Sequence, residues 1–172
     1  MVISQISLPL LLQRECSESH RDPAGDSAMA GVLRTNRLLR NVGDDWFSQL
    51  ISAGWRMEFG RDQVISHQGQ LIDAVIFIVD GEARAEIHSA SGRACKAVIG
   101  LLGPGDDIGS TTLVNGASHF ATVTAMKTVR TVHIPVEAMR ACLQRHGEWY
   151  RILAEAVAER LLANGIWLQA LL

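Results

Sequence analysis

Apolar and polar positions divide the chain into a helical beginning, a β-rich middle and a helical end. Between residues 32 and 50 apolar side chains recur at helical spacing, and a turn sequence at 41–44 interrupts them, which predicts two short helices. Beyond residue 54, short runs rich in β-branched residues alternate with glycines and polar pairs. This pattern predicts strands at 55–59, 63–66, 74–79, 83–88, 94–101, 120–125 and 129–134.

Two features of these strands indicate how they assemble. Asp80-Gly81 and Ser91-Gly92 predict tight turns, because glycine accepts the positive φ that hairpins need. The run at 74–79 is apolar throughout, so we expect a central strand that is covered on both faces. Short strands separated by turns are typical of a barrel or sandwich, and the predicted fold class is mainly β with flanking helices.

The helical period returns after residue 134. Pro135 predicts a helix start, since its fixed φ suits the first helical position, and the helix is expected over 136–144. In the last helix, from 148 onward, a narrow stripe recurs at steps of three and four residues. A stripe of this kind with one asparagine predicts a homodimer seam, and the alternative is a helix that folds back on its own core. The stripe consists of Tyr150, Leu153, Val157, Leu161, Asn164, Leu168 and Leu171.

The chain is therefore expected to have three parts. Residues 1–31 form a flexible arm in this interpretation, because a polar stretch with Pro23 and Gly25 follows a short apolar patch. Met29 precedes the first good helical pattern, so a start codon there is an alternative hypothesis. Residues 32–147 form the β-rich domain with its flanking helices, and residues 148–172 form the dimerisation helix.

Composition and charge narrow the class of protein. Of the 172 residues, 48% are hydrophobic and 20% charged, which is typical of a globular chain with a full core. The net charge of −2 lacks the basic footprint of nucleic-acid modules, so we expect no DNA binding by this chain. No apolar run reaches the roughly 20 residues of a membrane span, and no signal peptide is indicated. The widely spaced Cys16, Cys95 and Cys142 indicate reduced thiols and a cytoplasmic location.

Spaced glycines give the middle of the chain a recognisable motif set. The stretch 102–109 matches the motif L-x-x-G-D-x-F/I-G, and 121–125 matches A-x-V-x-A. Gly60, the stretch 64–69 and the strand and turn at 76–81 add three further matches. Together with the order of elements, these motifs resemble the cyclic-nucleotide-binding sensor domain of the CRP/FNR family of transcription regulators, over roughly residues 37 to 163. The resemblance implies a jelly-roll-like double-stranded β-helix, the cyclic-nucleotide-binding β-roll, followed by a long dimerisation helix.

The resemblance also implies a binding cassette, which this chain alters at two positions. In the family a short helix presents backbone N–H groups to the cyclic phosphate, an arginine pairs with its charge, and a glutamate accepts from the ribose hydroxyl. Here Ser110 stands at the glutamate position and His119 at the arginine position, so ordinary cAMP or cGMP binding is disfavoured. The candidate ligand-binding residues are Gly109, Ser110, Thr111, Thr112, His119, Phe120, Ala121 and Asn164.

The implied function is a non-catalytic regulatory sensor in transcription regulation. It binds a small effector, a cyclic nucleotide or another molecule, or has lost that ligand, and it signals through the dimer helix. Family members continue into a winged helix-turn-helix, and because the sequence ends at Leu172 we expect only the sensor and dimerisation half. The alternative is a ligand-independent interaction protein that forms heterodimers with full-length relatives.

Other chemistries lack their residue patterns in this sequence. The six histidines include no H-x-H pair and no pair at i, i+4, so neither a cupin-like metal enzyme nor another metal site is expected. No cysteine cluster indicates an iron–sulfur centre, and no G-x-S-x-G elbow indicates a nucleophile. Arg34, Arg37 and Arg40 share one predicted helix face, which we interpret as solvated.

Overall fold

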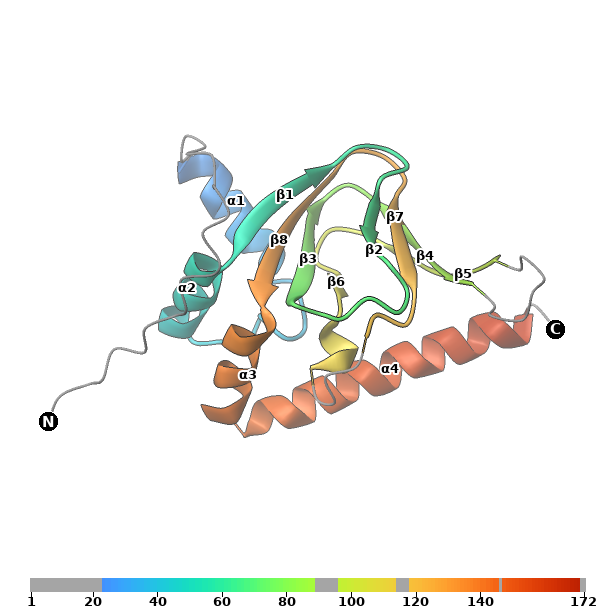
Figure 1. The fold of residues 1–172 in the computed structure, drawn as a ribbon. Coiled ribbons are helices and arrows are strands. Elements are labelled where there is room, and N and C mark those ends of the chain that lie inside the picture. Colours follow the sequence, from blue (N-terminus) through green and yellow to red (C-terminus); the bar gives the residue numbers. More distant parts are fainter. Residues whose placement is uncertain (1–22, 89–95, 114–117, 146, 171–172) are drawn as a thin grey trace, which may run out of the picture.

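Two antiparallel sheets form a β-roll, with three helices packed at one end and a long helix along one side (Figure 1). The computed structural model describes residues 23–88, 96–113, 118–145 and 147–170, without the side chains of 23–25, 112, 160, 161 and 163–170. The strands are β1 (Trp55–Phe59), β2 (Val64–Ser66), β3 (Ala74–Asp80), β4 (Ala83–His88), β5 (Lys96–Leu102), β6 (Asp107–Ile108), β7 (Thr122–Ala125) and β8 (Val129–Pro135). The helices are α1 (Pro23–Leu33), α2 (Asp44–Ala53), the 3₁₀ turn η2 (Ser110–Thr112), α3 (Val136–Arg145) and α4 (Glu148–Ala170).

The strand β3 lies inside the first sheet, whose order is β1-β8-β3-β6, and it separates two cores. Val75 and Phe77 face the helical core, a cluster formed mainly by the four α-helices. Ile76 and Ile78 face the roll core, which lies between this sheet and the second one, β2-β7-β4-β5. The five residues from Ala74 to Ile78 are all buried, so the predicted central strand covered on both faces is confirmed.

The helical core ties the ends of the described chain together. Leu33 of α1, Leu50 of α2, Met139 of α3 and Leu153 of α4 are each at most 2% exposed and belong to this one cluster. Burying a side chain of this size contributes about 1.5–3 kcal/mol. The start of α4 is thereby held against helices that lie more than a hundred residues earlier in the sequence.

Most strand predictions are confirmed, and the differences have local causes. Both ends of β1 and β4 agree, whereas the two-residue β6 was not predicted, because it is too short to show a periodic pattern. Pro135 ends β8, paired with Ala74, instead of opening the helix, and α3 begins at residue 136 as the expected range 136–144 has it.

The predicted arm and the first predicted helix are both shifted. Residues 23–33 form α1, where a flexible arm was predicted as far as residue 31, because Met29 and Leu33 are buried in the helical core. Residues 34–40, predicted to be helical, form consecutive turns instead, which run on into the predicted turn at 41–44. Residues 1–22 of the predicted arm, with Cys16, lie outside the described residues.

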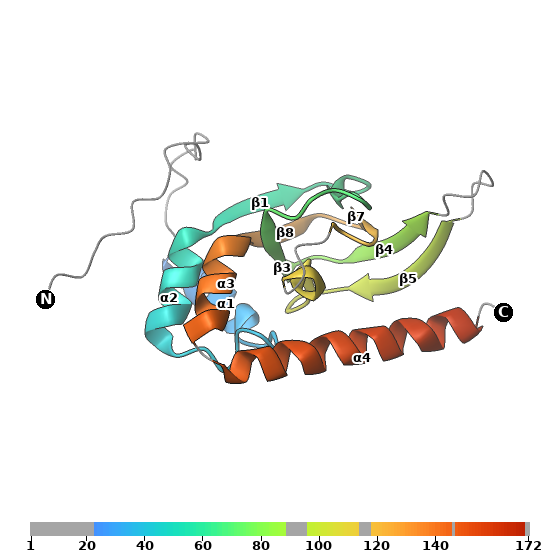
Figure 2. The same cartoon turned by 60° about the horizontal axis from the view of Figure 1, so that its bottom comes forward.

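The helix α4 runs along the roll beneath η2 and β5 (Figure 2). Its first half packs on its own chain, since Leu153 is 1% exposed in the helical core and Val157 lies against the same core. The predicted dimer seam requires Leu153 to face a partner helix, whereas here it is buried in the chain's own core. A heptad stripe marks a buried helix face but cannot distinguish a partner helix from the chain's own core. Tyr150 is exposed, which leaves it free for the predicted seam. The side chains of Leu161, Asn164, Leu168 and Leu171 lie outside the described residues, so that part of the dimer seam stays a prediction.

None of the helices in the described ranges is long and apolar enough to cross a membrane.

The turn after β3 provides a test of the roll's tight packing. Gly81 has φ +97°, and a Cβ there would lie 2.3 Å from the carbonyl oxygen of Thr128 and 2.7 Å from Cα of Val129. We expect Gly81→Ala to lower the free energy of unfolding by about 2 kcal/mol or more, because both the backbone conformation and the contact are unfavourable. Urea unfolding measures this, with Gly31→Ala as the control, since a Cβ at Gly31 meets nothing within 4 Å. Equal losses in the two variants would contradict the prediction.

Candidate functional site

A cavity of about 640 Å³ lies between the second sheet, η2, the β5–β6 turn and α4. Its volume is in the range of pockets that hold small molecules, roughly 300–1,000 Å³. The apolar wall comes from the roll core, through Ala85, Ile99, Ile108 and Val123. Five of the eight predicted ligand-binding residues line the cavity, namely Gly109, Thr111, His119, Phe120 and Ala121.

The backbone at the start of η2 is shaped by a glycine. Gly109 has φ +96°, and a Cβ there would lie 3.4 Å from Cε1 of His119, so glycine keeps this wall open. Ser110, which follows, is 3% exposed and is not among the described residues that line the cavity. The side chains of Thr112 and Asn164 lie outside the described residues, so their predicted roles stay predictions.

The backbone of His119 is fixed by the loop that follows β2. Its carbonyl oxygen accepts a hydrogen bond from the N–H of Gly69 at 2.7 Å, and its N–H donates to the carbonyl of Gln70 at 2.9 Å. The side chain is buried, and burial lowers its pKa below the ordinary value, against a smaller opposing effect from Asp73. The imidazole is therefore neutral near pH 7, so it offers a hydrogen bond to the cavity and no charge.

The segment between α1 and α2 forms a third wall, which the sequence analysis missed. Asn36 is buried, and its Nδ2 donates to the carbonyl of Gly105 at 2.9 Å and to Oδ1 of Asp107 at 3.2 Å. Its Oδ1 accepts from the N–H of Leu38 at 2.8 Å. The first two bonds attach residues 35–37 to the β5–β6 turn and so place Arg37 at the cavity, and the third fixes the local turn of the segment.

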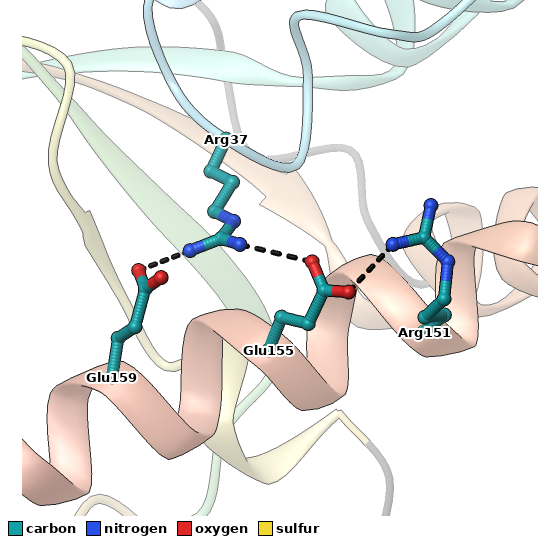
Figure 3. A network of polar contacts seen from close by, with 4 residues as sticks. All are labelled: Arg37, Arg151, Glu155 and Glu159. Atoms are coloured by element: carbon teal, nitrogen blue, oxygen red, sulfur yellow. Dashed lines mark hydrogen bonds and ion pairs between the residues drawn. The ribbon is translucent and has the colours of Figure 1, made fainter.

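Arg37 joins this wall to α4 (Figure 3). Its Nη2 donates to Oε2 of Glu155 at 2.9 Å, and its Nη1 donates to Glu159. The other oxygen of Glu155 accepts from Arg151 at 2.5 Å. The pKa of Glu155 is lowered, first by the hydrogen bond from Arg151 and further by Arg37, so the helix presents an ionised carboxylate to the guanidinium.

The predicted solvated arginine face is wrong for two of its three members. Arg34 lies over the ring of Phe47 and pairs with Asp44, and Arg37 lines the cavity, while Arg40 is exposed. The spacing of three residues could not predict these contacts, because it assumes a helix. The segment forms consecutive turns instead, which direct neighbouring side chains to different surroundings.

The charges around the cavity are unevenly distributed. Among the described residues that line it, Arg37 is the one permanently charged cation, and the three carboxylates belong to Asp106, Asp107 and Glu159. Asp106 accepts from the N–H of Gly103 at 2.8 Å, and Asp107 accepts from Asn36, so both carboxylates also hold the turn in place.

Comparison with known proteins assigns a family model to most of the β-roll. Residues 56–146 match the model described as "Cyclic nucleotide-binding domain". Among curated proteins, the chain is 25% identical over 105 residues to a lysophospholipase NTE1 of Coccidioides immitis. The match covers 61% of this chain and 6% of that protein, so it concerns a small part of the relative.

Solved structures with the same fold include sensor parts of regulators. The N-terminal domain of a transcriptional regulator from Streptomyces coelicolor A3(2) is 25% identical, with a TM-score of 0.60 over 82% of this chain and 95% of that one. The sensor domain of the transcriptional regulator DNR from Pseudomonas aeruginosa is 12% identical, with a TM-score of 0.70 over 80% and 91%. The Thermus thermophilus Catabolite Activator Protein is 21% identical, with a TM-score of 0.65 over 79% and 63%.

The described residues contain no group of three or more His, Cys, Asp or Glu side chains placed to hold a metal ion. Outside the cavity, His133 of β8 is buried and stacks on the rings of Trp55 and Phe59, with centroids 5.3 and 6.2 Å away. Its Nε2 lies 3.0 Å from Oγ1 of Thr131. Burial lowers the pKa of His133 to about 4, with a smaller opposing effect from Asp73.

This buried histidine predicts acid sensitivity of the fold. The unfolded chain takes up a proton near pH 6.5 and the folded chain only near pH 4, so stability is present above 6.5 and is lost as the pH falls between these values. We expect a loss of about 3 kcal/mol by pH 4, measured by urea unfolding at several pH values. His133→Phe keeps a ring for stacking and should make this loss clearly smaller, whereas the exposed His67→Gln should leave it unchanged. A His133→Phe profile identical to that of the parent would contradict the assignment.

Proposed function

Because this chain belongs to the cyclic nucleotide-binding domain family, we propose that it is a non-catalytic sensor that binds a small effector in the cavity and signals through α4. One observation carries the proposal, namely that the cavity is bounded both by the β-roll and by α4. Gly109, Thr111 and His119 line it from the roll, and Ala156 and Glu159 line it from the helix. An occupant therefore contacts both parts, and its binding energy can shift one against the other.

The effector we propose is not recognised as an ordinary cyclic nucleotide. A neutral imidazole stands where the family's arginine is expected, and the buried Ser110 stands where its glutamate is expected. Hydrogen bonds to charged groups contribute about 1.5–3 kcal/mol each. Losing both contacts weakens the binding of cAMP or cGMP by roughly two to four decades.

The output we propose is transcription regulation through the helix. Structures of the same fold include an N-terminal domain and a sensor domain of transcriptional regulators, which supports this role. The first half of α4 is anchored in the helical core and passes under η2, and the second half passes under β5. We infer that this second half forms the dimer seam and passes a shift of the roll to a DNA-binding partner or domain.

Isothermal titration with cAMP and cGMP tests the state of the cassette. We expect the parent chain to show no binding at micromolar concentration, and Ser110→Glu/His119→Arg to bind cAMP with a micromolar Kd, because the variant restores the charge pair and the ribose acceptor.

Ser48→Glu/His67→Arg carries the same substitutions at exposed positions away from the cavity and should stay silent. Micromolar binding by the parent would show an ordinary cyclic-nucleotide sensor. If neither the parent nor Ser110→Glu/His119→Arg binds a cyclic nucleotide, and circular dichroism shows that the variant is folded, the result would favour the ligand-independent interaction protein.

A further inference from the structure

Arg37 belongs to the cavity and to the attachment of α4 at the same time. It lines the cavity from the segment between α1 and α2, and its two terminal nitrogens hold Glu155 and Glu159, one turn apart on α4 (Figure 3). The segment itself is held on the β5–β6 turn by two hydrogen bonds of Asn36, and a third bond of Asn36 fixes its local turn. The backbone that carries Arg37 is therefore fixed in place, whereas the carboxylates that pair with its guanidinium can be exchanged for another anion.

The guanidinium has unused capacity and a replaceable partner. Its Nε–H is buried and finds no acceptor among the residues that the structure describes. The side chain of Glu159 is 66% exposed, so its carboxylate can leave Arg37 and be solvated at little cost. Glu155 keeps Arg151 as a second cationic partner when Arg37 is withdrawn.

We propose that Arg37 is the anion-binding residue of the cavity and that Glu155 and Glu159 mask it in this structure. A small molecule that carries a phosphate group displaces Glu155 and Glu159 and takes the planar guanidinium as its bidentate partner, with the neutral His119 as an additional hydrogen-bonding group. Binding of the phosphate and attachment of α4 to residues 35–37 are then competing events. The inference rests on the proposed sensor function and names its ligand class and its switch.

The competition is measured with cAMP as the phosphate probe and adenosine as the matched probe without charge. In Glu155→Gln/Glu159→Gln, two nearly isosteric changes remove the mask, and we expect cAMP to bind at least about tenfold more tightly than in the parent. Adding Arg37→Gln to that variant should abolish the gain. Adenosine affinity should be the same in all three proteins. The exposed Glu137→Gln on α3, outside the cavity, is the control and should match the parent.

Hydrogen exchange of the backbone amides of α4, measured without ligand, tests whether the ion pairs of Arg37 hold the helix in place. Exchange around residues 155–159 should be faster in Arg37→Gln and in the glutamine double variant than in the parent and in Glu137→Gln. Equal exchange in all four proteins would overturn the role of the ion pairs in holding the helix.

The titrations separate this inference from the proposed function. If Ser110→Glu/His119→Arg binds cAMP and removal of the two glutamates brings no gain, the sensor proposal stands and the role of Arg37 is overturned. A gain that persists after Arg37→Gln also overturns it. If none of the variants binds cAMP, both proposals fall.

Discussion

The strand β3 requires apolar cover on both faces, and the arrangement of the other elements follows from that requirement. Its side chains alternate between Val75 and Phe77 on one face and Ile76 and Ile78 on the other, all of them buried. One face is covered when the second sheet closes the roll, and the other when the helices pack on it. Leu153 belongs to the second cover, so α4 leaves the helical core pointing along the roll. There Ala156 and Glu159 of the helix form one side of the cavity.

The chemistry of the cavity follows from what the roll excludes. His119 is buried deeply enough to lose its charge, and the carboxylates of Asp106 and Asp107 are engaged in holding the turn. The permanent positive charge at the cavity is therefore that of Arg37, which lies outside the roll, between α1 and α2. The charge of this site therefore depends on how the segment between α1 and α2 packs on the roll. An arginine of the cassette, which is part of the roll itself, would not depend on that packing.

The sequence predicted the roll well because its signals are local. Strand runs, turn glycines and the spaced motifs around Gly109 each depend on a few neighbouring residues, and they placed five candidate residues at one cavity. The role of Arg37 depends on α4 more than a hundred residues later, so no spacing in its own segment could show it. The helix stripe failed at Leu153 for a related reason, since periodicity marks a buried face and does not say which chain buries it.

The hydrogen bonds of Asn36 divide the wall of the cavity into a hydrogen-bonded frame and a more exposed rim. Replacing Asn36 breaks contacts to Gly105, Asp107 and Leu38 together, so a substitution there disturbs the turn as well as its own segment. Phe120 is 44% exposed, and the carboxylates that pair with Arg37 are exposed or half-exposed, so a substitution at either residue disturbs the frame less than one at Asn36. A lineage carrying this fold can thus acquire a new effector through single substitutions at the rim while the framework beneath it is inherited unchanged.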